Sequence, residues 1–384
     1  MSDNMKLANE FIRQLEEQRA AYEAFAKERV APLFTQGDQR ERKPPGHFVN
    51  SSFLYARSFD GDTGSRPFSG PVFWLSPDMS VSPVSNLGAY TRTLNAGEYY
   101  TFNCTVRNRG DLAVPSAKVE FWLTDPSLGF DTRYARHLSL GAVPAGWVNP
   151  YSSASMSFTY MVPPTESGHK CLFARIFSFS PLDLPVDDFR LDPTLDRHIA
   201  QLNLNIVGQG QPFQFNVIHA PQAELFVQFA PMAVEAVQAL RHPVLADVRP
   251  FRDIPQEGWT ERTRIEPADT DAGDIGFDRT HDRVFLRAGD QEGADVGTQR
   301  EVRQLVKDAL AEINAGKSPT SAHRDLFAKQ REINRFARRT TFKMEAPDLG
   351  LDRDQVVGVH LRLIDANGQD EEALGGITLL VVGE

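Results

Sequence analysis

The segment from Asp269 to Asp278 holds four aspartates and is the part of this sequence most suggestive of metal binding. Asp269, Asp271, Asp274 and Asp278 surround a glycine, and oxygen ligands at alternate positions around a glycine turn can wrap a calcium ion. The third acid comes one position late, and Thr280 stands where such loops place a bidentate glutamate. The pattern therefore favours a solvated acidic loop, and we expect no metal and no cofactor.

Catalytic patterns are otherwise missing from the sequence. It contains no G-x-S-x-G, H-E-x-x-H, phosphate-binding P-loop or C-x-x-C motif. Residues 253–297 carry 12 acidic and 5 basic residues, and His281, Asp278 and Asp282 within them are the candidates for a hydrolase or metal-dependent enzyme. This remains the alternative to a protein without enzymatic activity, which is the interpretation we favour.

A second charged segment has the opposite sign. Residues 298–339 hold 10 basic and 5 acidic residues. Four arginines near the end of this segment form a possible docking face for an acidic partner: Arg331, Arg335, Arg338 and Arg339. The alternative is neutralisation within the molecule by the acidic stretch of residues 253–297.

The elements that would position these residues are mostly strands. Between residues 71 and 207 the apolar period is two, as in Tyr100-Thr-Phe-Asn-Cys-Thr-Val106, which is typical of antiparallel sheets with one buried face. About seven such runs fit a sandwich of two sheets. Phe102, Phe121 and Phe158 should lie in its core. Trp122 falls on the same strand face as Lys118 and Glu120, so it should point away from the core.

Residues 71–207 also resemble a known family. The run from Tyr100 to Gly110, the run Ala117-Lys-Val-Glu-Phe-Trp-Leu123 and the segment Gly168–Arg175 are similar to the cell-adhesion-related Ig-like module of bacteria. The resemblance implies an Ig-like β-sandwich and a tendency toward adhesion or assembly. Cys104 and Cys171 are expected to be buried thiols, with a disulfide as the alternative.

Residues 208–384 predict a second, smaller β-sandwich, interrupted by a mostly helical insertion at about 232–339. Thr298 and Glu301 have the spacing of a capping box at the start of one helix, and Ser318-Pro319 indicates the start of the next. Asn367-Gly368 is a hairpin signal, and His360 is expected to be a solvated strand residue. Two unrelated domains are the alternative.

Residues 1–36 predict an amphipathic helix, which residues 37–70 link to the rest. Its apolar stripe consists of Phe11, Ile12, Leu15, Tyr22 and Phe25. Such a stripe must be buried on the protein's own body or on a partner. We favour self-association or attachment to a larger assembly, because a sandwich closes its own core.

Composition limits the remaining possibilities. A net charge of −10 argues against sequence-independent nucleic-acid binding, which requires a basic face. Neither a secretory signal nor an apolar run of transmembrane length is visible. The sequence therefore predicts a mostly β structural or protein-interaction component, located in the cytoplasm or exported without a conventional signal as part of an assembly.

Overall fold

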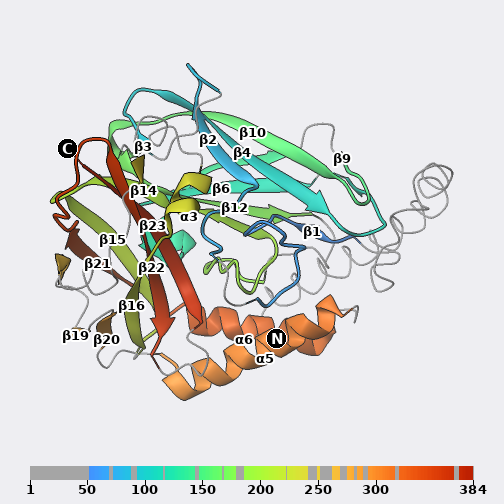
Figure 1. Ribbon diagram of the computed structural model, residues 1–384. Helices are drawn as coiled ribbons and strands as arrows, with labels where there is room; N and C mark the ends of the chain where they lie inside the picture. The colour runs from blue at the N-terminus through green and yellow to red at the C-terminus, as the bar shows by residue number, and fades with distance from the viewer. Residues whose placement is uncertain are drawn as a thin grey trace.

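The computed structural model is a mostly β protein built of several sheets, with helices at one end (Figure 1). It describes residues 52–68, 72–87, 93–115, 117–142, 147–166, 168–178, 186–221, 223–240, 249–250, 262–268, 275–280, 283–288, 293–315, 320–366 and 372–383. The predicted N-terminal helix lies outside these residues.

The first part of the chain contributes two four-stranded antiparallel sheets. One contains β1 (Leu54–Tyr55), β2 (Met79–Pro83), β4 (Tyr99–Asn108) and β10 (Ser153–Met161). The other contains β6 (Lys118–Thr124), β8 (Arg136–Ala142), β12 (Cys171–Phe177) and β13 (Ile199–Leu202). Two short pairs accompany them: β3 (Thr93–Leu94) with β11 (Gly168–His169), and β5 (Val114–Pro115) with β9 (Trp147–Val148).

Side chains from both sheets form one hydrophobic cluster, as the period-two pattern predicts. Phe102 and Phe121 are fully buried there, and Phe158 packs against them while remaining partly exposed. Trp122 instead contacts a separate cluster on the other side of its sheet, together with Cys171. Both thiols are free and buried in different clusters, Cys104 in the first and Cys171 in the second.

The second part of the chain also forms two sheets around one core. The larger contains β14 (Leu204–Gly208), β16 (Glu224–Pro231), β17 (Arg249–Pro250), β19 (Ile275–Thr280), β20 (Arg283–Ala288), β22 (Gln355–Asp365) and β23 (Ala373–Val382). The smaller contains β7 (Ser127–Leu128), β15 (Pro212–His219), β18 (Arg264–Pro267) and β21 (Arg338–Glu345).

Residues 232–339 differ from the expected, mostly helical insertion. They include β17 to β20, and these strands are hydrogen-bonded into the two sheets of the second part. Short strands flanked by glycine-rich, charged sequence give too weak a periodic signal for detection from sequence alone. Within the described residues of this segment, the helices are α3 (Val234–Ala239), α5 (Val296–Asn314) and α6 (Ser321–Asn334).

The start of each long helix also differs from the expectation. Asp295 is the N-cap of α5, and its side chain accepts a hydrogen bond from the Thr298 backbone, so the helix begins before the predicted capping box. Thr320 caps α6, with His323 completing a reciprocal capping box. Two one-turn 3-10 helices, η3 (Thr132–Tyr134) and η4 (Pro164–Glu166), complete the described helical elements.

The two parts of the chain are joined without a linker. The predicted single strand over residues 200–206 is in fact β13 in one sheet and β14 in another, separated only by Asn203. Asn203 is fully buried and donates from Nδ2 to the backbone oxygens of Ser127, at 3.0 Å, and Gly376, at 2.8 Å. An amide that satisfies two buried carbonyls at the crossing fixes the position where the chain changes sheets.

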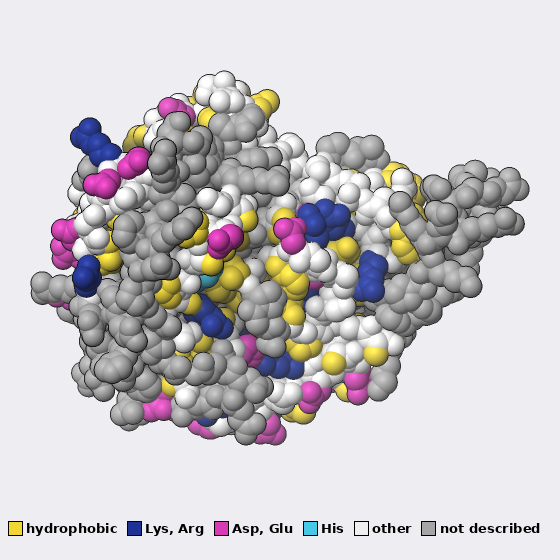
Figure 2. All heavy atoms as spheres, viewed as in Figure 1, with side chains coloured by type: hydrophobic (Ala, Val, Ile, Leu, Met, Phe, Trp, Pro, Cys, Tyr) yellow, Lys and Arg dark blue, Asp and Glu magenta, His cyan; other side chains and the backbone are white. Residues whose placement is uncertain are grey.

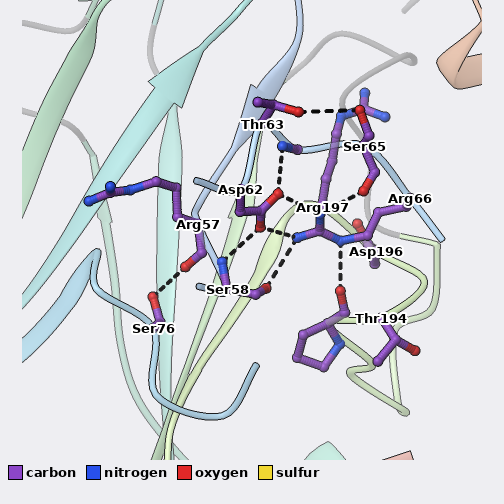
Figure 3. A network of polar contacts seen from close by, with 12 residues as sticks. Arg57, Ser58, Asp62, Thr63, Ser65, Arg66, Ser76, Thr194, Asp196 and Arg197 are labelled. Carbon is purple, nitrogen blue, oxygen red and sulfur yellow. Dashed lines mark hydrogen bonds and ion pairs between the residues drawn. The ribbon is translucent and has the colours of Figure 1, made fainter. Parts of the chain in front are cut away.

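Residues 186–198, which are buried from Pro193 to His198, connect the first sheets to the helices. Arg66, itself 3% exposed, donates to both carboxylate oxygens of Asp62, to Ser58 Oγ and to the Pro193 backbone oxygen (Figure 3). On the other side, Arg303 of α5 pairs with Asp192 at 2.9 Å. Leu195 packs into the cluster formed by α5 and α6. The helices therefore sit on a rigid, hydrogen-bonded support.

Candidate interaction surface

Strand β10 is the longest unpaired sheet edge in the first part of the structure. It pairs with β4 over Ser153–Met161, with Phe158 opposite Phe102 and Met156 opposite Cys104. Among the residues that the structure describes, no strand pairs with its other side. Figure 1 shows β10 running along the rim of the molecule. A strand edge presents backbone N–H and C=O groups that can pair with another strand.

The side chains of β10 offer none of the usual protection against such pairing. Its sequence, Ser-Ala-Ser-Met-Ser-Phe-Thr-Tyr-Met, contains no charged residue and no proline. The exposed face consists of hydroxyl and methionine side chains. Ser155 Oγ lies 3.1 Å from Thr105 Oγ1, and Ser157 donates to Asn103 on the neighbouring strand. The edge is therefore neutral and ordered by contacts within its own sheet.

The inward side of β10 extends the hydrophobic core to the rim. The ring of Phe158 stacks on Phe102 at 5.7 Å and on Phe121 at 5.8 Å between centroids. Phe158 and Tyr160 are nevertheless only partly buried. A strand added at this edge would cover the remaining apolar surface of both rings.

Exposed apolar side chains gather where β10 ends. Met161 pairs with Tyr99, and the Val84 backbone N–H donates to the Tyr99 carbonyl at 2.9 Å. These three side chains are 49%, 56% and 45% exposed, and Leu87, three residues beyond Val84, is 62% exposed. We call Val84, Leu87, Tyr99 and Met161 the tip residues. Apolar side chains grouped in this way are typical of contact sites.

Charged groups near the tip are paired with one another. Tyr160 Oη donates to Glu166 at 2.6 Å, and Arg136 lies 2.6 Å from the other oxygen of Glu166. Burial, together with the Glu166 carboxylate, raises the pKa of Tyr160, so this phenol stays neutral. No isolated charge at these residues opposes the approach of a neutral strand.

The four arginines predicted to form a docking face do not share one helix surface. Arg331 lies on α6 and donates to the Val186 carbonyl at 3.2 Å, and Arg335, at the end of that helix, pairs with Glu332 at 2.9 Å. Arg338 and Arg339 belong to β21. The helix ends before them, where Arg133 donates to the Asn334 and Ala337 carbonyls. Binding of an acidic partner at these residues stays a prediction.

Acidic residues from outside residues 253–297 neutralise much of the charge on α5. Arg303 pairs with Asp192, Arg300 with Asp365 at 3.1 Å, and Lys307 with Glu372. On the face shown in Figure 2, basic and acidic side chains are interspersed rather than gathered into one basic region. Three basic side chains of α5 are therefore neutralised within the molecule.

Most of the other predicted site residues lie outside the residues that the structure describes. Phe11, Ile12, Leu15, Tyr22 and Phe25 lie outside the described residues, as do Asp269, Asp271, Asp274, His281 and Asp282. Asp278 lies on β19, where its backbone is opposite Phe285 of β20.

Within the described part of the chain, no three His, Cys, Asp or Glu side chains gather as a metal site would require. In the same part, every helix is too short or too polar to cross a membrane.

Comparison with known proteins gives weak likenesses only. No protein family matches the sequence, and no curated protein matches it. Among solved structures, the CARDB domain of a Pyrococcus furiosus protein, solved in complex with di-metal ions, is 13% identical with a TM-score of 0.22 over 38% of this chain and 96% of that domain. The C-terminal domain of wzt is 9% identical, with a TM-score of 0.18 over 43% of this chain and 78% of that one.

A β-glucosidase from Listeria innocua, in complex with glucose, is also similar, at 10% identity and a TM-score of 0.18. The likeness covers 33% of this chain but only 16% of the glucosidase. At these scores the likenesses to a CARDB domain and to an enzyme agree with a coarse, β-rich resemblance and decide nothing about activity.

Proposed function

We propose that this protein is a non-enzymatic assembly component that self-associates by pairing the β10 strands of two copies. The observation that carries the proposal is the nine-residue β10 edge, which is neutral and has no strand partner among the described residues. The resemblance of residues 71–207 to the Ig-like adhesion module supports a role of this kind.

A second copy fits this edge because the strand is self-complementary. In an antiparallel pair centred on Ser157, Ser155 would face Thr159 of the second copy. On the inner side, Met156 would face Phe158 and cover the partly exposed ring. The two-fold pairing brings no like charges together, which is the usual obstacle to contact between identical surfaces.

The test is the molar mass of the purified chain measured by light scattering after size exclusion. We expect a dimer for the wild type and a monomer for Ser157→Lys, because two lysines would meet at the two-fold axis. Ser80→Lys is the matched control: Ser80 is on β2, across β4 from β10, and should leave the dimer intact. Melting temperatures close to that of the wild type would show that both variants fold.

A truncated chain separates this edge from the predicted N-terminal helix. Removing residues 1–36 should leave the dimer in place if β10 forms the contact. If the truncated chain is a monomer, the dimer contact is formed by the apolar stripe of the N-terminal helix and not by β10. A monomeric wild type, or a dimer that Ser157→Lys does not affect, would contradict pairing through β10.

A further inference from the structure

A cavity of about 90 Å³ lies where the helices meet the second pair of sheets. Its walls come from α5, α6, the support segment 186–198 and the ends of β15, β16, β22 and β23. In Figure 1, α5 and α6 lie across the ends of β16 and β22. At about 10–15 Å³ for each water centre, the cavity has room for several waters or for one small organic ion.

Three arginines line this cavity, and two of them are already paired. Arg300 bonds Asp365, and Arg303 bonds Asp192. The guanidinium of Arg190 has neither a hydrogen bond nor an ion pair with any described residue, although Asp192 and Asp187 contribute a favourable field. Burial and the neighbouring Arg303 lower the pKa of Arg190, whose side chain is half-buried in the cavity wall.

A buried acceptor without a partner lines the same cavity. Gln330 is 7% exposed, and its Oε1 accepts no hydrogen bond. Its orientation follows from its neighbours: Asn334 Nδ2 donates to Asp187 at 2.6 Å, which leaves Asn334 Oδ1 to accept from Gln330 Nε2 at 3.1 Å. A buried carbonyl oxygen left without a donor is costly, and such groups call for an explanation.

His219, another polar group of the wall, has a partner at each ring nitrogen. His219 Nδ1 lies 3.0 Å from the Ala220 carbonyl, and its Nε2 lies 3.0 Å from Thr340 Oγ1. With Nδ1–H donating to that carbonyl, Nε2 accepts from the threonine, and burial lowers the pKa of His219 and keeps the ring neutral. Asp365 and Glu224 also line the cavity, and Asp365 is paired with Arg300. Among Arg190, His219 and Gln330, the guanidinium of Arg190 and the carbonyl oxygen of Gln330 are without a hydrogen-bond partner among the described residues.

We propose that this cavity binds a small oxyanion that also carries a hydroxyl group, such as a hydroxycarboxylate or hydrogen phosphate. The oxyanion would pair with the guanidinium of Arg190 through charge-assisted hydrogen bonds, and the hydroxyl would donate to Gln330 Oε1. Arg190 and Gln330 line the same cavity although they are far apart in the chain. The site is independent of the β10 edge.

Calorimetric titration of the full chain with lactate, propionate and inorganic phosphate tests the proposal, at constant ionic strength. Lactate and propionate differ by the hydroxyl group, so lactate should bind about threefold to tenfold more tightly. Arg190→Gln should weaken lactate and phosphate binding at least tenfold, because it removes the charge-assisted hydrogen bonds to the oxyanion. Gln330→Leu should remove the preference for lactate and leave propionate binding unchanged.

Arg335→Gln is the control, because Arg335 is exposed and lies outside the cavity wall; it should bind as the wild type does. If Arg190→Gln does not fold, Arg190→Lys replaces it, and a loss of the bidentate geometry should still weaken binding. No saturable binding of lactate or phosphate up to about 20 mM would overturn the proposal. Equal affinities in wild type and the Arg190 variants would do the same.

Discussion

Trp74 donates a hydrogen bond of 3.0 Å from Nε1 to Thr378 Oγ1, across 304 positions of the chain. The tryptophan lies between β1 and β2 in the first part of the chain, and the threonine lies on β23 in the second. Both are buried, and the same hydroxyl lies 2.9 Å from His360 Nδ1. The Trp74 ring meets the His360 ring edge-on at 5.5 Å, so a polar and aromatic cluster holds the two parts together.

Replacing Thr378 should measure what this cluster contributes. Thr378→Val keeps the shape but leaves the Trp74 N–H and His360 Nδ1 without their partner, and we expect the free energy of unfolding to fall by about 2 kcal/mol. Urea denaturation would measure it. Thr165→Val, at an exposed threonine, should change stability by less than about 0.5 kcal/mol. A Thr378→Val chain as stable as that control would show that the hydroxyl is dispensable.

His360 should make stability depend on pH. Burial, with a smaller contribution from Arg362, lowers the pKa of His360 to about 4. Below the ordinary pKa of histidine the unfolded chain takes up a proton that the folded chain refuses, so this contribution to stability is lost as pH falls from about 6.5 toward 4.

The matched variant is His360→Gln, which keeps an acceptor for Thr378. Between pH 7.5 and pH 4.5 the wild type should lose about 2 kcal/mol more stability than the variant, by urea denaturation at each pH. Parallel losses in the two proteins would assign the pH dependence to other groups, such as His219, whose pKa burial also lowers.

The aromatic core of the first sheets should show graded sensitivity to truncation. Phe102→Ala and Phe121→Ala remove fully buried rings and should each cost about 3–5 kcal/mol of stability. Phe158→Ala should cost only about 2 kcal/mol, because its ring is partly exposed at the β10 edge. Measured in dilute protein, equal losses for all three would place Phe158 deeper in the core.

How far the sequence predicted this structure depends on the range of each interaction. The alternating pattern correctly predicted that Phe121 and not Trp122 enters the core, because neighbouring side chains on one strand point to opposite faces of the sheet. Strand neighbours are not local: nothing in the residues of β10 shows that its second side has no partner. The absence of charge from Ser153 to Met161 was the available signal.

Contacts between residues that are distant in the chain leave no local pattern, and for this reason the sequence did not predict the cavity or the crossing between sheets. Arg190 and Gln330 meet only through folding, and each alone is an ordinary polar residue. His360, expected to be solvated, is buried enough to bond Thr378 because Trp74 from the first part covers it. Residues 200–206 show continuous alternation, so their division between two sheets at Asn203 leaves no trace in the pattern.

The crossing at Asn203 has a mechanical consequence. A single residue separates β13 from β14. A β-carbon on Gly376 would lie only 2.1 Å from the ring of Trp74, so the two parts pack closely where they meet. Neither a hinge nor slack chain is available there for one part to swing against the other. We therefore expect the rim at β10 to keep a constant distance and angle from the helical end of the molecule.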